Sequence, residues 1–119
     1  MTFRPTGADA ELSAVRYLKQ QGLVVVAQNY RGRFGEIDLV MRDGETLVFV
    51  EVRLRCNPGF GGAAASIDAR KQRRIIRTAQ QYLATLEKIP VCRFDVVLLD
   101  NPQGDEVQWL KNAFDAGIN

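Results

Sequence analysis

Two strand-like runs joined by a short polar turn place the strongest constraint on how this chain can fold. Residues 36–41 are EIDLVM and residues 46–54 are TLVFVEVRL, and these runs are rich in β-branched and aromatic residues. The dipeptide Asp43-Gly44 between them tolerates the positive φ angles of a type I′ turn. The segment therefore predicts an antiparallel hairpin.

Two acidic residues, Asp38 and Glu51, interrupt the apolar runs of this hairpin. A carboxylate in such a run is costly unless it is paired or bound to a metal. With Asp43-Gly44 as a two-residue loop, Asp38 faces Phe49. Side chains alternate along a strand, so Asp38, Glu51 and Arg53 share one face. The diagonal pair Asp38 and Glu51 then has Cβ atoms within about 7–8 Å, and one Mg²⁺ can bridge carboxylates at that separation.

A solvated sheet face is the competing interpretation of the two acids. The same face of the second strand also carries Leu47 and Phe49, which favour a buried core. Acids that share a face with such residues indicate a partly buried site. Glu36 lies on the same face as Asp38 and is a further candidate ligand.

Composition excludes several classes of function. The chain of 119 residues has no histidine, which excludes Ser-His-Asp and Cys-His catalysis and imidazole zinc sites. Cys56 and Cys92 stand far apart, which argues against a zinc site or a disulfide scaffold. The remaining ligands are mainly carboxylates and carbonyls, which favour Mg²⁺ or Mn²⁺. Because the sequence shows neither a signal peptide nor a membrane-length apolar run, we expect a single cytoplasmic domain over residues 1–119 with no membrane partner.

Basic residues are concentrated in one part of the chain. Residues 53–93 contain nine Lys or Arg and two Asp or Glu, a local charge of +7 in a chain of net charge +2. A basic segment next to an acidic cluster fits a protein that grips phosphates and holds a cation beside them. A solvated helix face is the competing explanation. The candidate nucleic-acid-binding residues are Arg70, Lys71, Arg73, Arg74 and Arg77.

Hydrophobic periodicity predicts two helices and three further strands around the hairpin. The helices are expected at residues 8–20 and 67–88, and the strands at residues 23–29, 91–99 and 106–111. Gly22 ends the first helix, Ser66 caps the second, and the chain after residue 112 is expected to fray. The order predicts an α/β fold, one mixed sheet of about five strands with helices packed on it.

Three further features are candidates for function. Glu11 lies three, four and seven residues before apolar positions of the first helix, and Gln72 has the same spacings in the second. Most acids in the position of Glu11 simply flank an apolar stripe. Residues 30–35, YRGRFG, are an ordinary turn or a contact to nucleic acid, since arginines bind phosphate and aromatics stack. The glycine-rich residues 56–65 indicate a mobile loop or a plain linker.

The segments GEIDLVMRDG, LVFVEVR and FGGAAASI followed by RKQRR resemble the YraN family of small bacterial proteins. This resemblance covers residues 7–110. An Asp, a hairpin and then Glu-x-Lys on the next strand is similar to the pattern of the PD-(D/E)xK nuclease superfamily, and the YraN family is similar to archaeal Holliday-junction resolvases. One departure from the superfamily pattern is Arg53, which stands at the lysine position.

The resemblance implies a restriction-endonuclease-like αβββαβ core and a metal-dependent endonuclease that acts on DNA, with branched DNA among its candidate substrates. It also implies a homodimer, as in resolvases. A nucleic-acid-binding module of the same fold without cleavage is one alternative. A structural or interaction protein, whose carboxylates bind a cation only for stability, is another.

The resemblance also assigns roles to residues. The metal ligands for Mg²⁺ or Mn²⁺ would be Asp38, Glu51, the Val52 carbonyl and Glu11. Arg53 would clamp phosphate oxygens, and it cannot act as a general base because its pKa stays above about 12. Gln72 and Lys71 would contact the attacked phosphate or orient water.

Overall fold

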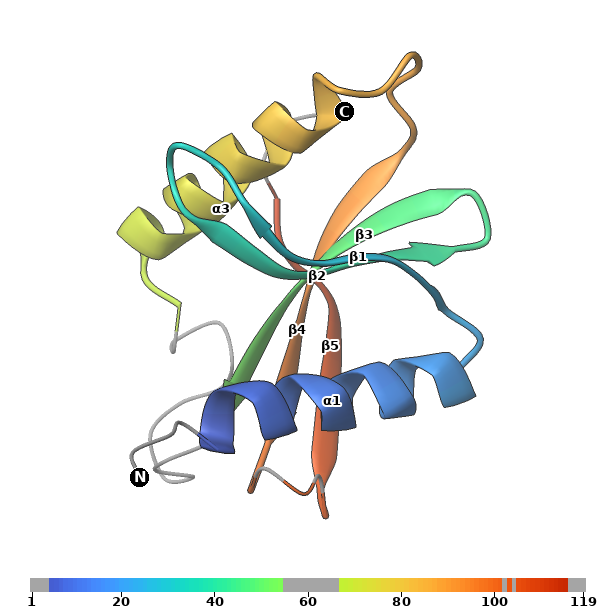
Figure 1. Ribbon diagram of the computed structural model, residues 1–119, viewed down its shortest axis with the longest axis vertical. Coiled ribbons are helices and arrows are strands. Elements are labelled where there is room, and N and C mark those ends of the chain that lie inside the picture. Colours follow the sequence, from blue (N-terminus) through green and yellow to red (C-terminus); the bar gives the residue numbers. More distant parts are fainter. Residues whose placement is uncertain (1–4, 55–66, 102, 104, 116–119) are drawn as a thin grey trace.

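The computed structural model describes residues 5–54, 67–101, 103 and 105–115 (Figure 1). The elements in this part of the chain are α1 (Pro5–Gln20), β1 (Val24–Arg31), β2 (Glu36–Asp43), β3 (Thr46–Leu54), α3 (Ala69–Leu83), β4 (Cys92–Leu99) and β5 (Val107–Phe114). The strands form one sheet in the order β1-β2-β3-β4-β5, with β3 and β4 parallel and the other neighbours antiparallel. The predicted mixed α/β sheet and its αβββαβ order are confirmed.

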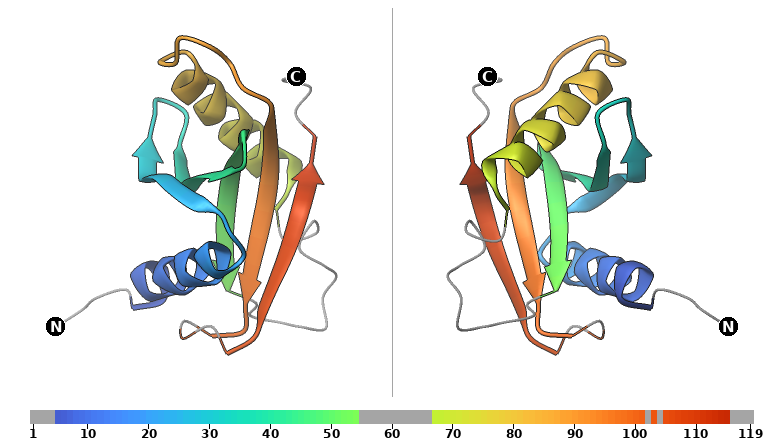
Figure 2. Two further views of the ribbon diagram at one scale, coloured as in Figure 1. Left: turned by 90° about the vertical axis from the view of Figure 1, so that its right-hand side faces the viewer. Right: turned by 90° about the vertical axis from the view of Figure 1, so that its left-hand side faces the viewer.

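The two helices cover opposite faces of the sheet. In Figure 2, α3 lies behind β4 in the left view and in front of it in the right view, whereas α1 packs from the other side. Side chains of β3 alternate between the two cores, with Leu47 and Phe49 in the α3 core and Val48 and Val50 in the α1 core. Because both faces are buried, the central strands are almost continuously apolar in sequence. Neither helix in the described ranges combines the length and apolar character that a bilayer span requires.

The hairpin loop lies one residue further along the chain than predicted. Asp43 pairs with Thr46, so the two-residue loop is Gly44 and Glu45. Gly44 has a φ of 62°, whereas Glu45 is not among the described residues with positive φ. Glycine at the first central position is typical of a type II′ turn, so the predicted type I′ turn at Asp43-Gly44 is wrong.

The shifted loop changes which residues pair across the hairpin. Phe49 pairs with Val40, so the predicted pairing of Phe49 with Asp38 is wrong. The same register, continued by one step, brings Asp38 level with Glu51 instead of diagonal to it. The loop keeps an even number of residues, so the predicted common face of the two acids is retained.

The two edge strands differ from their predictions. β1 was expected to be buried, but Val24 and Val26 are 49% and 40% exposed because β1 has a neighbour on one side only. β5 was expected to end at residue 111, followed by a frayed tail. It continues to Phe114, because this ring stacks on Phe94 with centroids 4.9 Å apart.

The start of α3 is set by Asp68. Its side chain accepts a hydrogen bond from the Lys71 N–H at 2.8 Å, the usual geometry of an N-cap. The helix therefore begins at Ala69, two residues later than predicted. The predicted cap Ser66 and the glycine-rich residues 56–65 lie outside the described residues.

The end of α3 comes five residues before the predicted residue 88. The N–H and the hydroxyl of Thr85 both donate to the Tyr82 carbonyl, at 3.0 and 2.7 Å. These bonds to the third residue back tighten the last turn and stop the α-helical pattern. Pro90, which was expected to break the helix, follows only after this turn.

A buried carboxylate ties the hairpin, β4 and β5 together. Asp95 is fully buried and accepts hydrogen bonds from the Arg93 guanidinium at 3.0 and 3.2 Å and from the Trp109 indole at 2.9 Å. The Asn112 N–H adds a third donor at 2.9 Å, at the end of the strand where the β4–β5 register shifts. Arg93 also donates to Asp43 at 2.9 Å. The carboxylate is thus fully satisfied and has a structural role.

Replacement of Asp95 with alanine should therefore destabilise the protein severely. The change removes one of the two carboxylate partners of the mostly buried Arg93 guanidinium and leaves two N–H groups without their acceptor. Breaking a buried ion pair costs about 3–5 kcal/mol. Urea unfolding of Asp95→Ala measures the loss. Glu45→Ala, on the exposed hairpin turn, is the control and should change the free energy of unfolding by less than about 0.5 kcal/mol. Equal losses in the two variants would contradict this account.

Candidate metal and phosphate site

The carboxyl groups of Asp38 and Glu51 meet where β2 and β3 separate. The pairing of the two strands ends at Leu39 and Val50. One residue further, the Asp38 carboxylate accepts a hydrogen bond from the Val52 N–H at 2.8 Å. A side chain thus replaces the backbone carbonyl that would continue the ladder. Glu51 stands level with Asp38, and their carboxyl groups share a hydrogen bond.

Two cationic groups flank the Glu51 carboxylate. The Lys71 ammonium of α3 lies 3.7 Å from Glu51 Oε2, and the Arg53 Nε atom of β3 lies 3.6 Å from the same oxygen. The side chain of Glu51 is 7% exposed, whereas those of Lys71 and Arg53 are about one-third exposed. The acid pair is therefore enclosed, with basic groups on its solvent side.

Burial raises the pKa of Glu51 to about 7, and the neighbouring Asp38 carboxylate adds to the increase. The charges of Lys71 and Arg53 oppose it without cancelling it. Burial also raises the pKa of Asp38, while the hydrogen bond from Val52 lowers it. The pair therefore holds a shared proton more strongly than isolated carboxyl groups would.

Glu11 approaches this pair from α1. Burial is the largest cause of the raised pKa of Glu11, and the charge of Asp38 raises this pKa further. Its carboxylate is hydrogen-bonded to the side chain of Asn29 on β1. Asn29 has a φ of 52°, a backbone conformation that asparagine tolerates better than most residues. Glu11 therefore lies at the margin of the acidic site, and its predicted role as a metal ligand remains a prediction.

The donor groups suit a hard divalent cation. Asp38 and Glu51 supply carboxylate oxygens, and the Val52 carbonyl is expected on the same side of β3 as its N–H. Within the described ranges, no three acidic or cysteine side chains converge as a complete ligand set. Mg²⁺ commonly takes only one or two carboxylates and completes its shell with water and phosphate oxygens, so a two-carboxylate site fits this ion.

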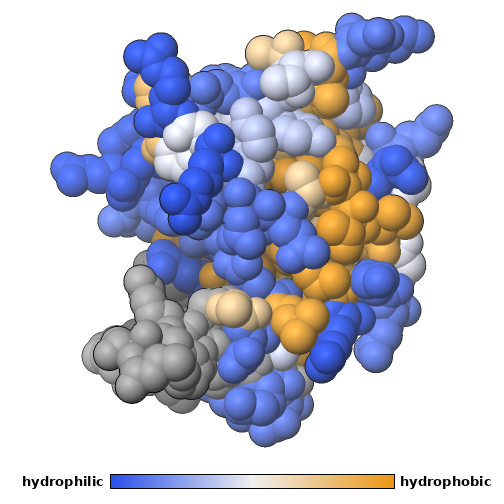
Figure 3. Space-filling model, in the orientation of Figure 1, coloured by the Kyte–Doolittle hydropathy of each residue, from blue (hydrophilic) through white to orange (hydrophobic). Residues whose placement is uncertain are grey.

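The basic side chains of α3 form a continuous surface next to the acid pair. Arg70, Arg73, Arg74 and Arg77 are exposed, and Lys71 is half-buried against Glu51. Figure 3 shows hydrophilic residues gathered over α3 and the adjoining β1–β2 turn. Gln72 is turned toward the start of the helix, where its amide donates to the Ile67 carbonyl at 2.9 Å. Its predicted contact with phosphate or water remains a prediction.

Sequence reasoning missed the residues that link distant segments at this site. Asn29 was included in a buried strand, although an asparagine at the end of an apolar run indicates an irregular backbone. Gln81 was not singled out, and it binds the β1–β2 turn through the N–H of Arg33 at 2.7 Å. No sequence pattern indicates that second contact, because the two residues are 48 positions apart.

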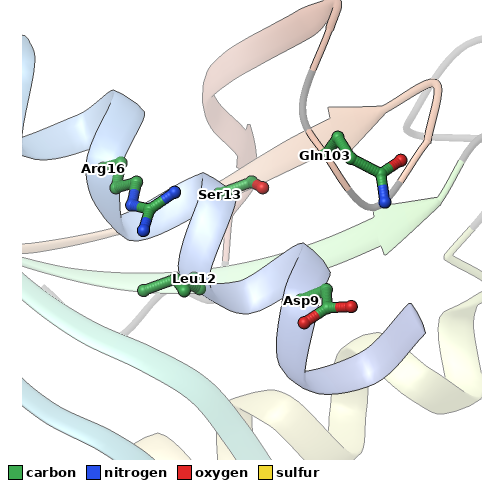
Figure 4. Close-up of a pocket in the computed structure, with 5 residues that line it drawn as sticks. All are labelled: Asp9, Leu12, Ser13, Arg16 and Gln103. Atoms are coloured by element: carbon green, nitrogen blue, oxygen red, sulfur yellow. The ribbon is translucent and has the colours of Figure 1, made fainter. Parts of the chain in front are cut away.

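A separate hollow of about 200 Å³ lies on the outer side of α1 (Figure 4). Its lining residues are Asp9, Leu12, Ser13, Arg16 and Gln103. Figure 4 shows the first four on consecutive turns of α1 and Gln103 on the β4–β5 connection, with its amide pointing away from Ser13. The hollow includes neither Asp38 nor Glu51 and is therefore distinct from the acid pair.

The fold and the site define a mixed α/β domain in which a buried Glu51 meets a half-buried Asp38 where two strands diverge. The family model described as "Uncharacterised protein family UPF0102" matches residues 10–99, and the chain belongs to this family. A UPF0102 protein of Nitrosospira multiformis is 55% identical over the full length of both chains. One from Nitrosomonas europaea is 56% identical over 92% of each chain, and one from Cupriavidus metallidurans is 59% identical over 93% of this chain and 81% of its own. The resemblance to the YraN family is thereby confirmed.

The raised pKa of Glu51 predicts how stability changes with pH. The pKa is about 7 in the folded protein against an ordinary 4.5, so the folded state binds more protons between these values. The free energy of unfolding of the metal-free protein should therefore fall as the pH rises through this window. Glu51→Gln removes the ionisable group and should stabilise the metal-free protein at pH 8 by about 1–3 kcal/mol.

Urea unfolding in EDTA at pH 5 and pH 8 measures this difference. The advantage of Glu51→Gln over wild type should shrink strongly at pH 5, where Glu51 is protonated in the folded protein. Glu45→Gln is the control, since this exposed acid lies on the hairpin turn. A Glu51→Gln variant that is less stable than wild type at pH 8 would show that the ion pairs outweigh the desolvation of the carboxylate.

Proposed function

We propose that the protein is a metal-dependent phosphodiesterase that acts on DNA. The observation that carries the proposal is the enclosed pair Asp38 and Glu51, flanked by the cations of Lys71 and Arg53. Two adjacent carboxylates that are shielded from water destabilise a fold when both are ionised, so their presence favours a cation that compensates them. The wider likeness to PD-(D/E)xK nucleases and resolvases supports the same assignment.

The residues of the site suggest a division of roles. Asp38 and Glu51, with the Val52 carbonyl, would hold Mg²⁺ or Mn²⁺. When bound, the ion lowers the pKa of a coordinated water and offsets charge on the phosphate. Glu11 would orient a water or a second ion from the α1 side.

Arg53 would bind non-bridging phosphate oxygens through its planar guanidinium. It stays protonated and cannot remove a proton from water. Lys71 would change partner from Glu51 to the phosphate, since both are within reach of one flexible side chain. Gln72, one position further along α3, would support the water or phosphate.

The exposed arginines of α3 would bind the flanking backbone of the nucleic acid. Arg70, Arg73, Arg74 and Arg77 project from one helix, and phosphate contacts of this kind supply most non-specific affinity for DNA. A binding module without cleavage is the second candidate, because Arg53 holds the position at which the nuclease pattern has lysine. The homodimer that the resolvase likeness implies belongs to the same proposal.

Single-turnover cleavage of labelled duplex, single-stranded and four-way-junction DNA in Mn²⁺ tests the proposal. Wild type should cleave in Mn²⁺ and not in EDTA, and Asp38→Asn should not cleave. Arg53→Ala should lose about 10²–10³-fold in rate, the scale of removing one preorganised charge-stabilising donor. Arg53→Lys should retain activity.

Glu45→Gln, on the hairpin turn, is the matched control and should cleave as wild type does. Cleavage gained only in Arg53→Lys would favour the binding module. An absence of cleavage by wild type and by both Arg53 variants on all three substrates would contradict the proposed activity.

A further inference from the structure

The β1–β2 turn is fixed against α3 by specific contacts. The Arg33 N–H donates to the Gln81 side-chain oxygen at 2.7 Å. A side chain at Gly32 would collide with that same oxygen and would push the Gln81 amide away from this position. Gly35 has a φ of 151° and lies beside Thr78 and Arg74 of the helix. The turn is therefore held in one position.

Phe34 stands in this turn, and two guanidinium groups lie near its ring. Arg77 of α3 lies 5.5 Å from the ring centroid, and Arg33 of the turn lies 6.0 Å from it. The ring nevertheless remains 40% exposed. Cation–π attraction at these distances helps to orient the ring. The result is a partly exposed aromatic ring with two positive charges nearby.

Phe34 lies within reach of a strand that crosses the acid pair. Arg77 follows Lys71, the partner of Glu51, by six residues, which is about 9 Å along the helix axis. That length corresponds to about three base steps of 3.4 Å. On the other side, β2 runs directly from the turn to Glu36 and Asp38. The basic surface between the two points carries Arg73 and Arg74.

We propose that Phe34 is a stacking platform for an unpaired base, with Arg33 and Arg77 binding the adjoining phosphates. The inference rests on the proposed function, because it takes nucleic acid as the partner, and it names the substrate class as single-stranded or branched nucleic acid. Bases inside a duplex are stacked on one another, whereas an unpaired base can present its face to an aromatic side chain. Gln81 and Gly32 already fix the turn, so the exposed ring is not needed to hold it.

Fluorescence anisotropy in EDTA tests this proposal without cleavage. Three ligands of equal length are compared, namely a single strand, a blunt duplex and a single strand with an abasic tract. Phe34→Ala should weaken binding of the intact single strand by about 5- to 100-fold, the scale of losing one base–aromatic stack. Binding of the duplex and of the abasic strand should change little. Phe34→Tyr should bind the single strand as wild type does.

Ile89→Ala is the matched control, because Ile89 is a 67% exposed apolar residue beyond the end of α3. Equal affinity of wild type and Phe34→Ala for the intact strand would overturn the inference. An equal loss on intact and abasic strands would also overturn it, since the ring would then act only by positioning the arginines. Phe34-dependent binding by a protein that never cleaves in Mn²⁺ would support the inference and contradict only the proposed activity.

Discussion

The hydrogen bond from the Val52 N–H to the Asp38 carboxylate is the contact on which the rest of the site depends. It satisfies the backbone where the β2–β3 ladder opens, so the strands can separate without leaving a buried N–H unpaired. It also turns the Asp38 side chain toward Glu51, which lies level with it on the next strand. The parallel pairing of β3 with β4 continues past this point and keeps Glu51 fixed. A rigid strand and a divergent one thus bring two carboxyl groups together at the point where the β2–β3 pairing ends.

Two buried acids on neighbouring strands show how differently such groups can be used. Asp95 on β4 accepts hydrogen bonds from a guanidinium, an indole and a backbone N–H, so its charge is compensated within the fold. Glu51 on β3 is also buried, but the cations near it stand 3.6 and 3.7 Å from its oxygen, and its pKa is raised to about 7. The first arrangement is typical of a structural carboxylate. The second arrangement favours a bound cation that would neutralise the remaining negative charge of Glu51.

Much of the fold could be predicted from local patterns, because strands alternate and helices repeat in ways that the sequence displays. The common face of Asp38 and Glu51 followed from the even number of loop residues and did not depend on the turn type. The register did depend on the position of the turn. The loop was predicted at Asp43-Gly44 but lies at Gly44 and Glu45, so the predicted pairing of the two strands was displaced. The hydrogen bond that holds the β1–β2 turn to Gln81 could not be predicted, because it joins residues 48 positions apart. The length of α3 was likewise set by a hydroxyl contact of Thr85 that competes with the helical pattern.

Calorimetric titration of Mn²⁺ into the purified protein tests the central claim, that the acid pair is a divalent-cation site. The account predicts one binding event per chain for wild type and for the surface control Glu45→Gln. Asp38→Asn and Glu51→Gln keep the shape of each side chain but remove its charge, and both should lose most of the binding heat. Equal binding by all four proteins would contradict the account, because the ion would then be held somewhere other than between β2 and β3.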